Sequence, residues 1–141
     1  MTKIERFFTR YEMGANSFDP DLVCSLYTIE FMGAGPGGVM CGRNGEDLRQ
    51  WNVQRRAFFQ QIGFRRAKVL DVEETLLDDR YTMAKVHWRM TFETQLGCPL
   101  DFEFFLTYVL FDDGSGPKVA FWISHDDEQK VMRDAGLIPA S

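Results

Sequence analysis

A tyrosine on the apolar face of the first predicted helix is the leading candidate for a chemical role. Ile4, Phe7, Phe8 and Tyr11 are spaced i, i+3, i+4 and i+7, so they share one helical face. A hydroxyl on a buried face needs a hydrogen-bond partner or a wet pocket. The pattern predicts that this helix forms one wall of a cavity, where Tyr11 donates a hydrogen bond to a ligand oxygen. The alternative is a core tyrosine bonded to a backbone carbonyl.

Two polar residues interrupt the apolar stripe of a second long predicted helix. Asn52 and Arg55 fall within this stripe, where a cavity would use them to orient a polar or anionic group. The alternative is that Asn52 bonds locally and Arg55 extends past the rim. The apolar members of the stripe are Leu48, Trp51, Phe58, Phe59 and Ile62.

Glu74 is the predicted proton-transfer group. On the alternating strand predicted for residues 64–77, it lies in phase with Lys68, Leu70, Val72 and Leu76. Burial of that face would raise the pKa of the Glu74 carboxyl, which suits a general acid or base. The alternative is a β-bulge that breaks the register and turns Glu74 outward.

The sequence gives no sign of a metal or a cofactor, and we expect neither. His125 precedes three acids, residues 126–128, but the chain has only two histidines and a helix start explains the acids. The three cysteines form no Cys-x-x-Cys pair, which is typical of reduced thiols in a cytoplasm. Gly33, Gly35 and Gly38 match G-x-G-x-x-G, but an apolar extended run follows them where a dinucleotide-binding loop would open a helix. We therefore interpret these glycines as a turn between two short strands.

The length of 141 residues suits one domain, residues 1–141. A net charge of −5 argues against nucleic acid as the main partner. No apolar run of about 18 residues is present, so no membrane span is expected. The N-terminus has no apolar signal core, which favours a cytoplasmic location.

The order of the predicted elements indicates an α+β fold. Short turns favour antiparallel neighbours, so we expect one curved antiparallel sheet, a long four-stranded meander plus a short N-terminal hairpin, wrapped around about three helices. Asn44 is predicted to cap the third helix. The predicted helices begin near residues 2, 19, 44 and 126, and the predicted long strands cover residues 64–77, 81–93, 100–111 and 118–124.

The strands supply the other predicted wall of the cavity. Alternation gives the third long strand apolar groups on both faces, including Phe105, Val109 and Phe111 on the face that should meet water. Burial of that outer face against a second copy explains this pattern, so a homodimer through the sheet is predicted. The bulky residues predicted to line the sheet side of the cavity, or to be ordinary core, are Trp88, Met90, Phe104, Tyr108 and Trp122.

Over nearly its whole length, the chain resembles the nuclear transport factor 2-like superfamily. This cone-shaped fold is shared by SnoaL-like polyketide cyclases and ketosteroid isomerase. The resemblance implies a pocket between the helices and the concave sheet, and frequently a homodimer joined through the sheet. The residues on which the resemblance rests are Arg10-Tyr11, residues 19–23, the strand from Ala84 to Met90, and residues 121–125 (Phe-Trp-Ile-Ser-His).

The resemblance implies a role for one residue. Tyr11 matches the tyrosine of helix one that donates to the oxyanion in ketosteroid isomerases. Where that enzyme has its aspartate base this chain has a glycine run, and Thr107 is the best match to its second aspartate. Proton abstraction next to a ketone would lack its first step, so steroid isomerisation is not expected.

The predicted function is binding of a small apolar or amphipathic organic ligand. If the protein is an enzyme, the expected chemistry is cofactor-free acid/base work of the isomerase, cyclase, dehydratase or hydrolase type. Tyr11 would then polarise an oxygen, Glu74 would move a proton and Arg55 would anchor the ligand. The alternative is a non-catalytic homodimeric protein-interaction module.

Overall fold

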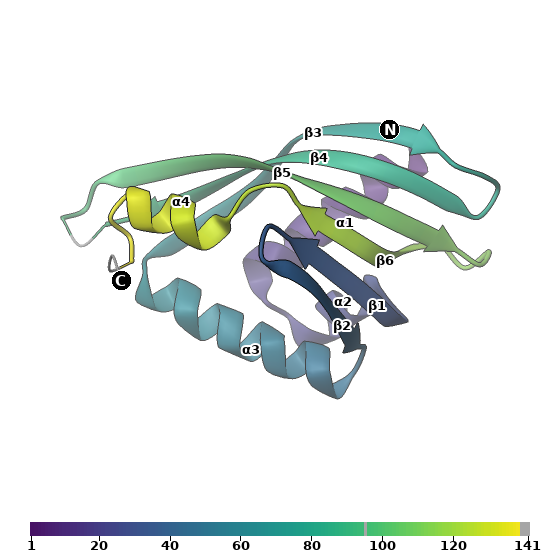
Figure 1. Ribbon diagram of the computed structural model, residues 1–141, viewed down its shortest axis with the longest axis horizontal. Coiled ribbons are helices and arrows are strands. Elements are labelled where there is room, and N and C mark those ends of the chain that lie inside the picture. The colour runs from purple at the N-terminus through teal and green to yellow at the C-terminus, as the bar shows by residue number, and fades with distance from the viewer. Residues whose placement is uncertain (95, 139–141) are drawn as a thin grey trace.

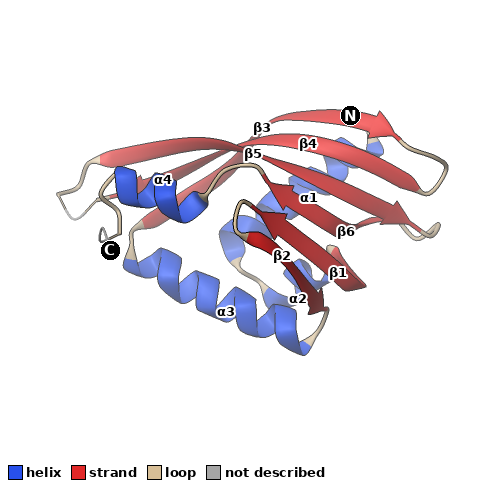
Figure 2. Cartoon of the chain, in the orientation of Figure 1, coloured by secondary structure: helices blue, strands red, loops and turns tan. Residues whose placement is uncertain are grey.

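The computed structural model describes residues 1–94 and 96–138, so residues 95 and 139–141 of the predicted domain lie outside the described part. In these ranges a curved sheet lies over three helices, and a fourth, short helix follows the last strand (Figures 1 and 2). The elements are α1 (Lys3–Ser17), α2 (Pro20–Ser25), β1 (Tyr27–Gly35), β2 (Gly38–Arg43), α3 (Glu46–Gln61), β3 (Phe64–Leu76), β4 (Tyr81–Glu93), β5 (Pro99–Asp112), β6 (Pro117–Ser124) and α4 (Glu128–Asp134).

The six strands have the order β2-β1-β6-β5-β4-β3. The predicted α+β class, the β3–β6 meander and the β1–β2 hairpin are confirmed. The expectation of an all-antiparallel sheet is wrong at one place, because β1 pairs with β6 in parallel. Short turns fix the direction only of the strands that they join, and no turn joins β1 to β6.

The predicted start of α1 is confirmed. The Glu5 backbone N–H donates to Thr2 Oγ1 at 3.0 Å, and the Thr2 N–H donates to Glu5 Oε1 at 3.0 Å, which forms a capping box. The helix continues three residues past Gly14, where we expected it to end. Gly14 is buried against α2, since a Cβ added there would lie 3.3 Å from Leu26 Cδ1. This glycine allows two helices to approach and does not stop the first.

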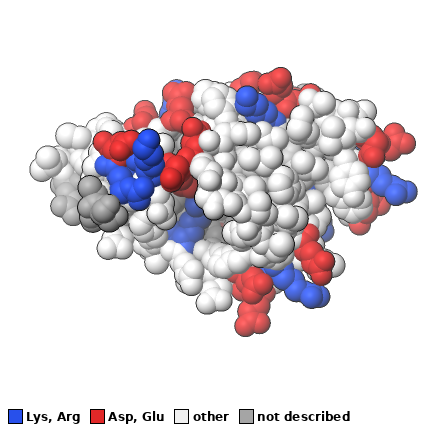
Figure 3. All heavy atoms as spheres, viewed as in Figure 1, with Lys and Arg blue, Asp and Glu red and all other residues white. Residues whose placement is uncertain are grey.

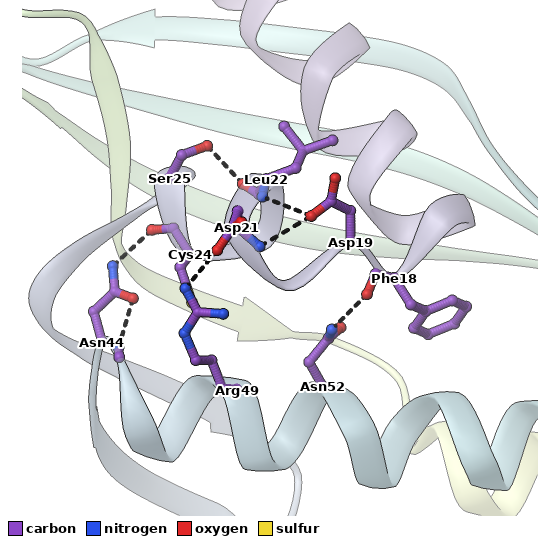
Figure 4. Close-up of polar contacts among 10 residues, drawn as sticks. Phe18, Asp19, Asp21, Leu22, Cys24, Ser25, Asn44, Arg49 and Asn52 are labelled. Carbon is purple, nitrogen blue, oxygen red and sulfur yellow. Dashed lines mark hydrogen bonds and ion pairs between the residues drawn. The ribbon is translucent and has the colours of Figure 1, made fainter.

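The cap predicted for α3 is wrong. Gly45 is the N-cap and supplies no side-chain hydrogen bond. The Asn44 side chain instead donates to the carbonyl oxygen of Cys24 at 2.7 Å (Figure 4). It also donates to the carbonyl oxygen of Tyr27 at 2.9 Å. Asn44 therefore ties the end of β2 to the α2–β1 connection, a long-range role that a local capping pattern does not reveal.

The hydrophobic core lies between the helices and the concave face of the sheet. The predicted inner face of α1 is confirmed, because Ile4, Phe7 and Phe8 are all buried. Their partners on the sheet include Val86 and Leu110, which are also fully buried. The helices cover only this face, so the outer face of the sheet has no covering layer in the described chain (Figure 1).

Candidate functional site

A cavity of about 260 Å³ lies between α1, α3 and the concave face of the sheet. Its walls are mostly apolar, and eight of the nine residues predicted for the site contribute to them. These eight come from five different elements, so the helical and the strand periodicities identified the walls of the same cavity. They are Tyr11, Asn52, Arg55, Trp88, Met90, Phe104, Tyr108 and Trp122.

Three phenols meet in this cavity. The hydroxyls of Tyr11 and Tyr27 form a hydrogen bond of 2.5 Å. The Trp88 Nε1–H donates to the hydroxyl of Tyr108 at 3.0 Å, and the ring centroids of Tyr11 and Tyr108 are 5.3 Å apart. The predicted cavity position of Tyr11 is therefore observed, and its hydroxyl bonds to another side chain. We call Tyr11, Tyr27 and Tyr108 the phenol cluster.

The phenol cluster is electrically neutral at ordinary pH. Burial raises the pKa of Tyr11, and hydrogen bonds with Tyr27 and Tyr108 together with the charge of Arg55 oppose this rise. Burial raises the pKa of Tyr27 and of Tyr108 well above the usual range, and the neighbouring phenols raise both further. All three hydroxyls thus keep their protons. Each has one proton to donate, so the Tyr11 proton is available to a ligand when Tyr27 is the donor of the Tyr11–Tyr27 hydrogen bond.

Two glycines make room for two of the indoles that line the cavity. A Cβ added at Gly33 in β1 would lie 2.2 Å from Trp122 Cζ2, and one added at Gly42 in β2 would lie 2.7 Å from Trp51 Cη2. Residues 36–37 form the turn of the hairpin, but the three glycines of the G-x-G-x-x-G match, which we interpreted as the turn, lie in the strands, as does Gly42. Their lack of a side chain sets the position of the indoles and hence the shape of the cavity.

The Asn52 side chain forms a hydrogen bond that stabilises the fold. It is buried on α3, and its Nδ2 donates to the Phe18 carbonyl oxygen at 2.8 Å (Figure 4). Phe18 ends α1 with a φ of 56°, a left-handed conformation that side chains other than glycine seldom adopt. The amide therefore stabilises the corner between α1 and α2. Contact between Asn52 and a ligand stays a prediction.

An ion pair lies at the solvent end of the cavity. Arg55 Nη2 is 3.4 Å from Glu128 Oε1, and both residues line the cavity. Their side chains are 46% and 37% exposed, so they mark its mouth. In Figure 3, basic and acidic side chains meet at a hollow between α4 and α3. Sequence reasoning missed Glu128, because the approach of α4 to α3 leaves no local signal.

The predicted buried position of Glu74 is wrong. Glu74 pairs with Ala84 near the end of β3, but it is exposed and does not line the cavity. Its Oε2 accepts a hydrogen bond from Thr2 Oγ1 at 2.7 Å, at the N-terminus of α1. Alternation predicts which face of a strand a residue occupies, but it does not show how far the helices cover that face.

Cavity and fold together define an NTF2-like protein. The chain belongs to the family described as NTF2-like protein (DUF6841), whose model matches residues 2–127. No curated protein shows detectable sequence similarity to the chain.

Solved structures agree on the fold. An NTF2-like protein with a cystatin-like fold from Novosphingobium aromaticivorans is 13% identical, with a TM-score of 0.73 over 98% of this chain and 88% of that one. A protein of unknown function from Mycobacterium tuberculosis is 17% identical, with a TM-score of 0.71 over 89% and 70%. A ketosteroid isomerase-like protein from Erwinia carotovora atroseptica is 14% identical, with a TM-score of 0.66 over 86% and 92%. At these identities the similarity establishes the fold alone.

Among residues 1–94 and 96–138, no three His, Cys, Asp or Glu side chains lie close enough together to hold a metal ion. In the same part of the chain, no helix has the length and apolar character needed to span a membrane.

Proposed function

We propose that this protein binds a small, mostly apolar organic molecule in the cavity, and that Tyr11 donates a hydrogen bond to an oxygen of that molecule. The phenol cluster carries the proposal, because it places protonated hydroxyls in a mostly apolar cavity. Pockets for drug-sized ligands usually measure roughly 300–1,000 Å³, so a cavity of about 260 Å³ suits a molecule of one or two fused rings.

The lining favours binding and oxygen polarisation over proton abstraction. A buried hydroxyl aimed at a carbonyl or phenolate oxygen would stabilise negative charge there. Proton abstraction also needs a base within reach of the ligand. Of the described lining residues, Glu128 is the one carboxylate, and it is paired with Arg55 at the mouth. We therefore retain a polarising role for Tyr11 and no proton-transfer role for Glu74.

The tryptophans allow a direct test. Trp51, Trp88 and Trp122 are the three tryptophans of the chain, and all line the cavity. Titration with 2-naphthol should shift all three indole N–H signals in NMR spectra with one saturable dissociation constant. Tyr11→Phe should weaken binding by roughly 3- to 10-fold, the value of one hydrogen bond.

Two controls accompany this titration. Naphthalene has no oxygen, so Tyr11→Phe should leave its affinity unchanged. Tyr81→Phe alters a tyrosine that is 39% exposed and does not line the cavity, so it should not change the affinity for 2-naphthol. If no indole signal moves as 2-naphthol approaches its solubility limit, the binding proposal fails.

We also propose that two copies of the chain associate through the outer face of the sheet, in the cytoplasm. Four apolar residues there are in register across four strands and form an outer row, made of Met83, Val109, Phe121 and Met32. Figure 3 shows few charged side chains over β5, β6 and β1. Phe105, 39% exposed, lies further along β5 on the same face, where the His87 ring stacks on it. Apolar surface of this kind is typical of protein interfaces.

Sedimentation of the purified protein tests the association. The unaltered chain should sediment as a dimer, and Phe121→Glu, which places a charge in the outer row, should shift it to the monomer. Val53→Glu is the control, since it makes a comparable change at a residue that is 64% exposed on α3, away from the outer face of the sheet. A monomer at all accessible concentrations of the unaltered protein would refute the dimer.

A further inference from the structure

We propose that the natural ligand carries a carboxylate at the end opposite its hydrogen-bonding oxygen, and that Arg55 binds this carboxylate in place of Glu128. The inference rests on the proposed ligand-binding function and names the class of ligand. It predicts a flat aromatic acid whose oxygen meets the phenol cluster while its carboxylate remains at the mouth.

The guanidinium of Arg55 has a defined position at the mouth. Its Cζ lies 4.2 Å from the ring centroid of Phe59, one turn further along α3. Phe59 is only 2% exposed, so it forms a fixed surface for the guanidinium. Trp51 lies one turn before Arg55 and also lines the cavity, which places an aromatic wall beside the charge.

The ion pair between Glu128 and Arg55 is weak. One oxygen–nitrogen contact of 3.4 Å joins the two side chains, although a guanidinium has five N–H donors and binds carboxylates best through two parallel hydrogen bonds. Both side chains are more than one-third exposed, and such pairs add little stability. A ligand carboxylate that makes two hydrogen bonds, and whose aromatic body is buried, would displace Glu128.

The phenol cluster and the mouth are near enough for one small ligand to reach both. Arg55 and all three phenols line the same cavity of about 260 Å³, so a ligand of two fused rings can contact both. Burial raises the pKa of Tyr11 and of Tyr27, and the positive charge of Arg55 opposes this rise. Of the described lining residues, Arg55 is the one cation, and all remaining polar groups there are neutral except Glu128. A ligand with a neutral oxygen at one end and a negative charge at the other matches this arrangement.

The test compares two molecules that differ only in the carboxylate. We expect 6-hydroxy-2-naphthoate to bind more tightly than 2-naphthol, as measured on the indole N–H signals. Arg55→Gln should weaken binding of the naphthoate at least about tenfold, the usual value of a charge-assisted hydrogen bond, and should change binding of 2-naphthol less than about twofold. Glu128→Gln should tighten binding of the naphthoate alone.

Arg56→Gln is the control, because it removes an equal charge from an exposed neighbour on α3 that does not line the cavity. It should leave the affinity for the naphthoate within about twofold of the unaltered protein, given the screening of exposed charges. Dispersed NMR spectra of every variant confirm that each is folded.

The outcomes separate the two proposals. If Arg55→Gln binds both molecules as the unaltered protein does, the carboxylate site is refuted while the proposed binding function stands. If Glu128→Gln weakens binding of the naphthoate, its displacement by the ligand is refuted. If neither molecule binds to the unaltered protein, both the proposed function and this inference are refuted.

Discussion

Replacing Gly63 with alanine should lower the free energy of unfolding by roughly 2–5 kcal/mol, a large part of the stability of a domain this size. Gly63 joins α3 to β3 with a φ of 89°, a conformation that alanine disfavours. An added Cβ would also lie 2.1 Å from the carbonyl oxygen of Glu93. The Glu93 N–H donates to the Gly63 carbonyl oxygen at 2.8 Å, so the two backbone segments cannot move apart without losing this hydrogen bond.

Equilibrium unfolding in urea measures this effect. Gly37→Ala is the matched control, since Gly37 lies in the β1–β2 turn, its φ is outside the left-handed region, and no atom lies within 4 Å of an added Cβ. The control should change the unfolding free energy little. Equal unfolding midpoints for the two variants would contradict the described corner between α3 and β3.

Gly33→Ala should lower the unfolding free energy by about 1–3 kcal/mol, the usual cost of overpacking. It should also reduce the affinity for 2-naphthol by more than about tenfold, because a displaced indole occupies ligand space. Its Cβ would lie 2.2 Å from Trp122 Cζ2, so the indole, which lines the cavity, has to move. Urea unfolding and the indole N–H titration measure the two effects.

Gly35→Ala provides a close comparison on the same strand. Gly35 is two residues further along β1, on the same face, and an added Cβ there would make only ordinary contacts of 3.9 Å with Ser124. This variant should keep both stability and affinity. If Gly33→Ala behaves in the same way as Gly35→Ala, the proposed role of Gly33 in shaping the cavity is wrong.

Local periodicity predicted the walls of the cavity well. Helical spacing placed Tyr11 and Arg55 on inward faces, and strand alternation did the same for Trp88 and Tyr108. These predictions succeeded because the side-chain direction along one element follows from its period. The same reasoning found the meander, whose neighbours are joined by short turns.

Contacts between distant elements could not be predicted in this way. The Tyr11–Tyr27 hydrogen bond, the Arg55–Glu128 pair and the parallel pairing of β1 with β6 each depend on how separate elements pack. The error at Glu74 has the same origin, because a register shift earlier in β3 breaks the simple alternation and the helical cover ends before Glu74. Packing between distant elements therefore determines both the hydrogen bond in the phenol cluster and the ion pair at the mouth of the cavity.

A crystal structure of the protein with 2-naphthol would examine the proposed binding site itself. We expect the naphthol in the cavity between α1, α3 and the sheet, with its oxygen within about 3.2 Å of the Tyr11 hydroxyl oxygen. The aromatic rings should lie against the indoles that line the walls. A solid interior without space for the molecule, or naphthol bound only on the outer face of the sheet, would contradict a ligand site built around the phenol cluster.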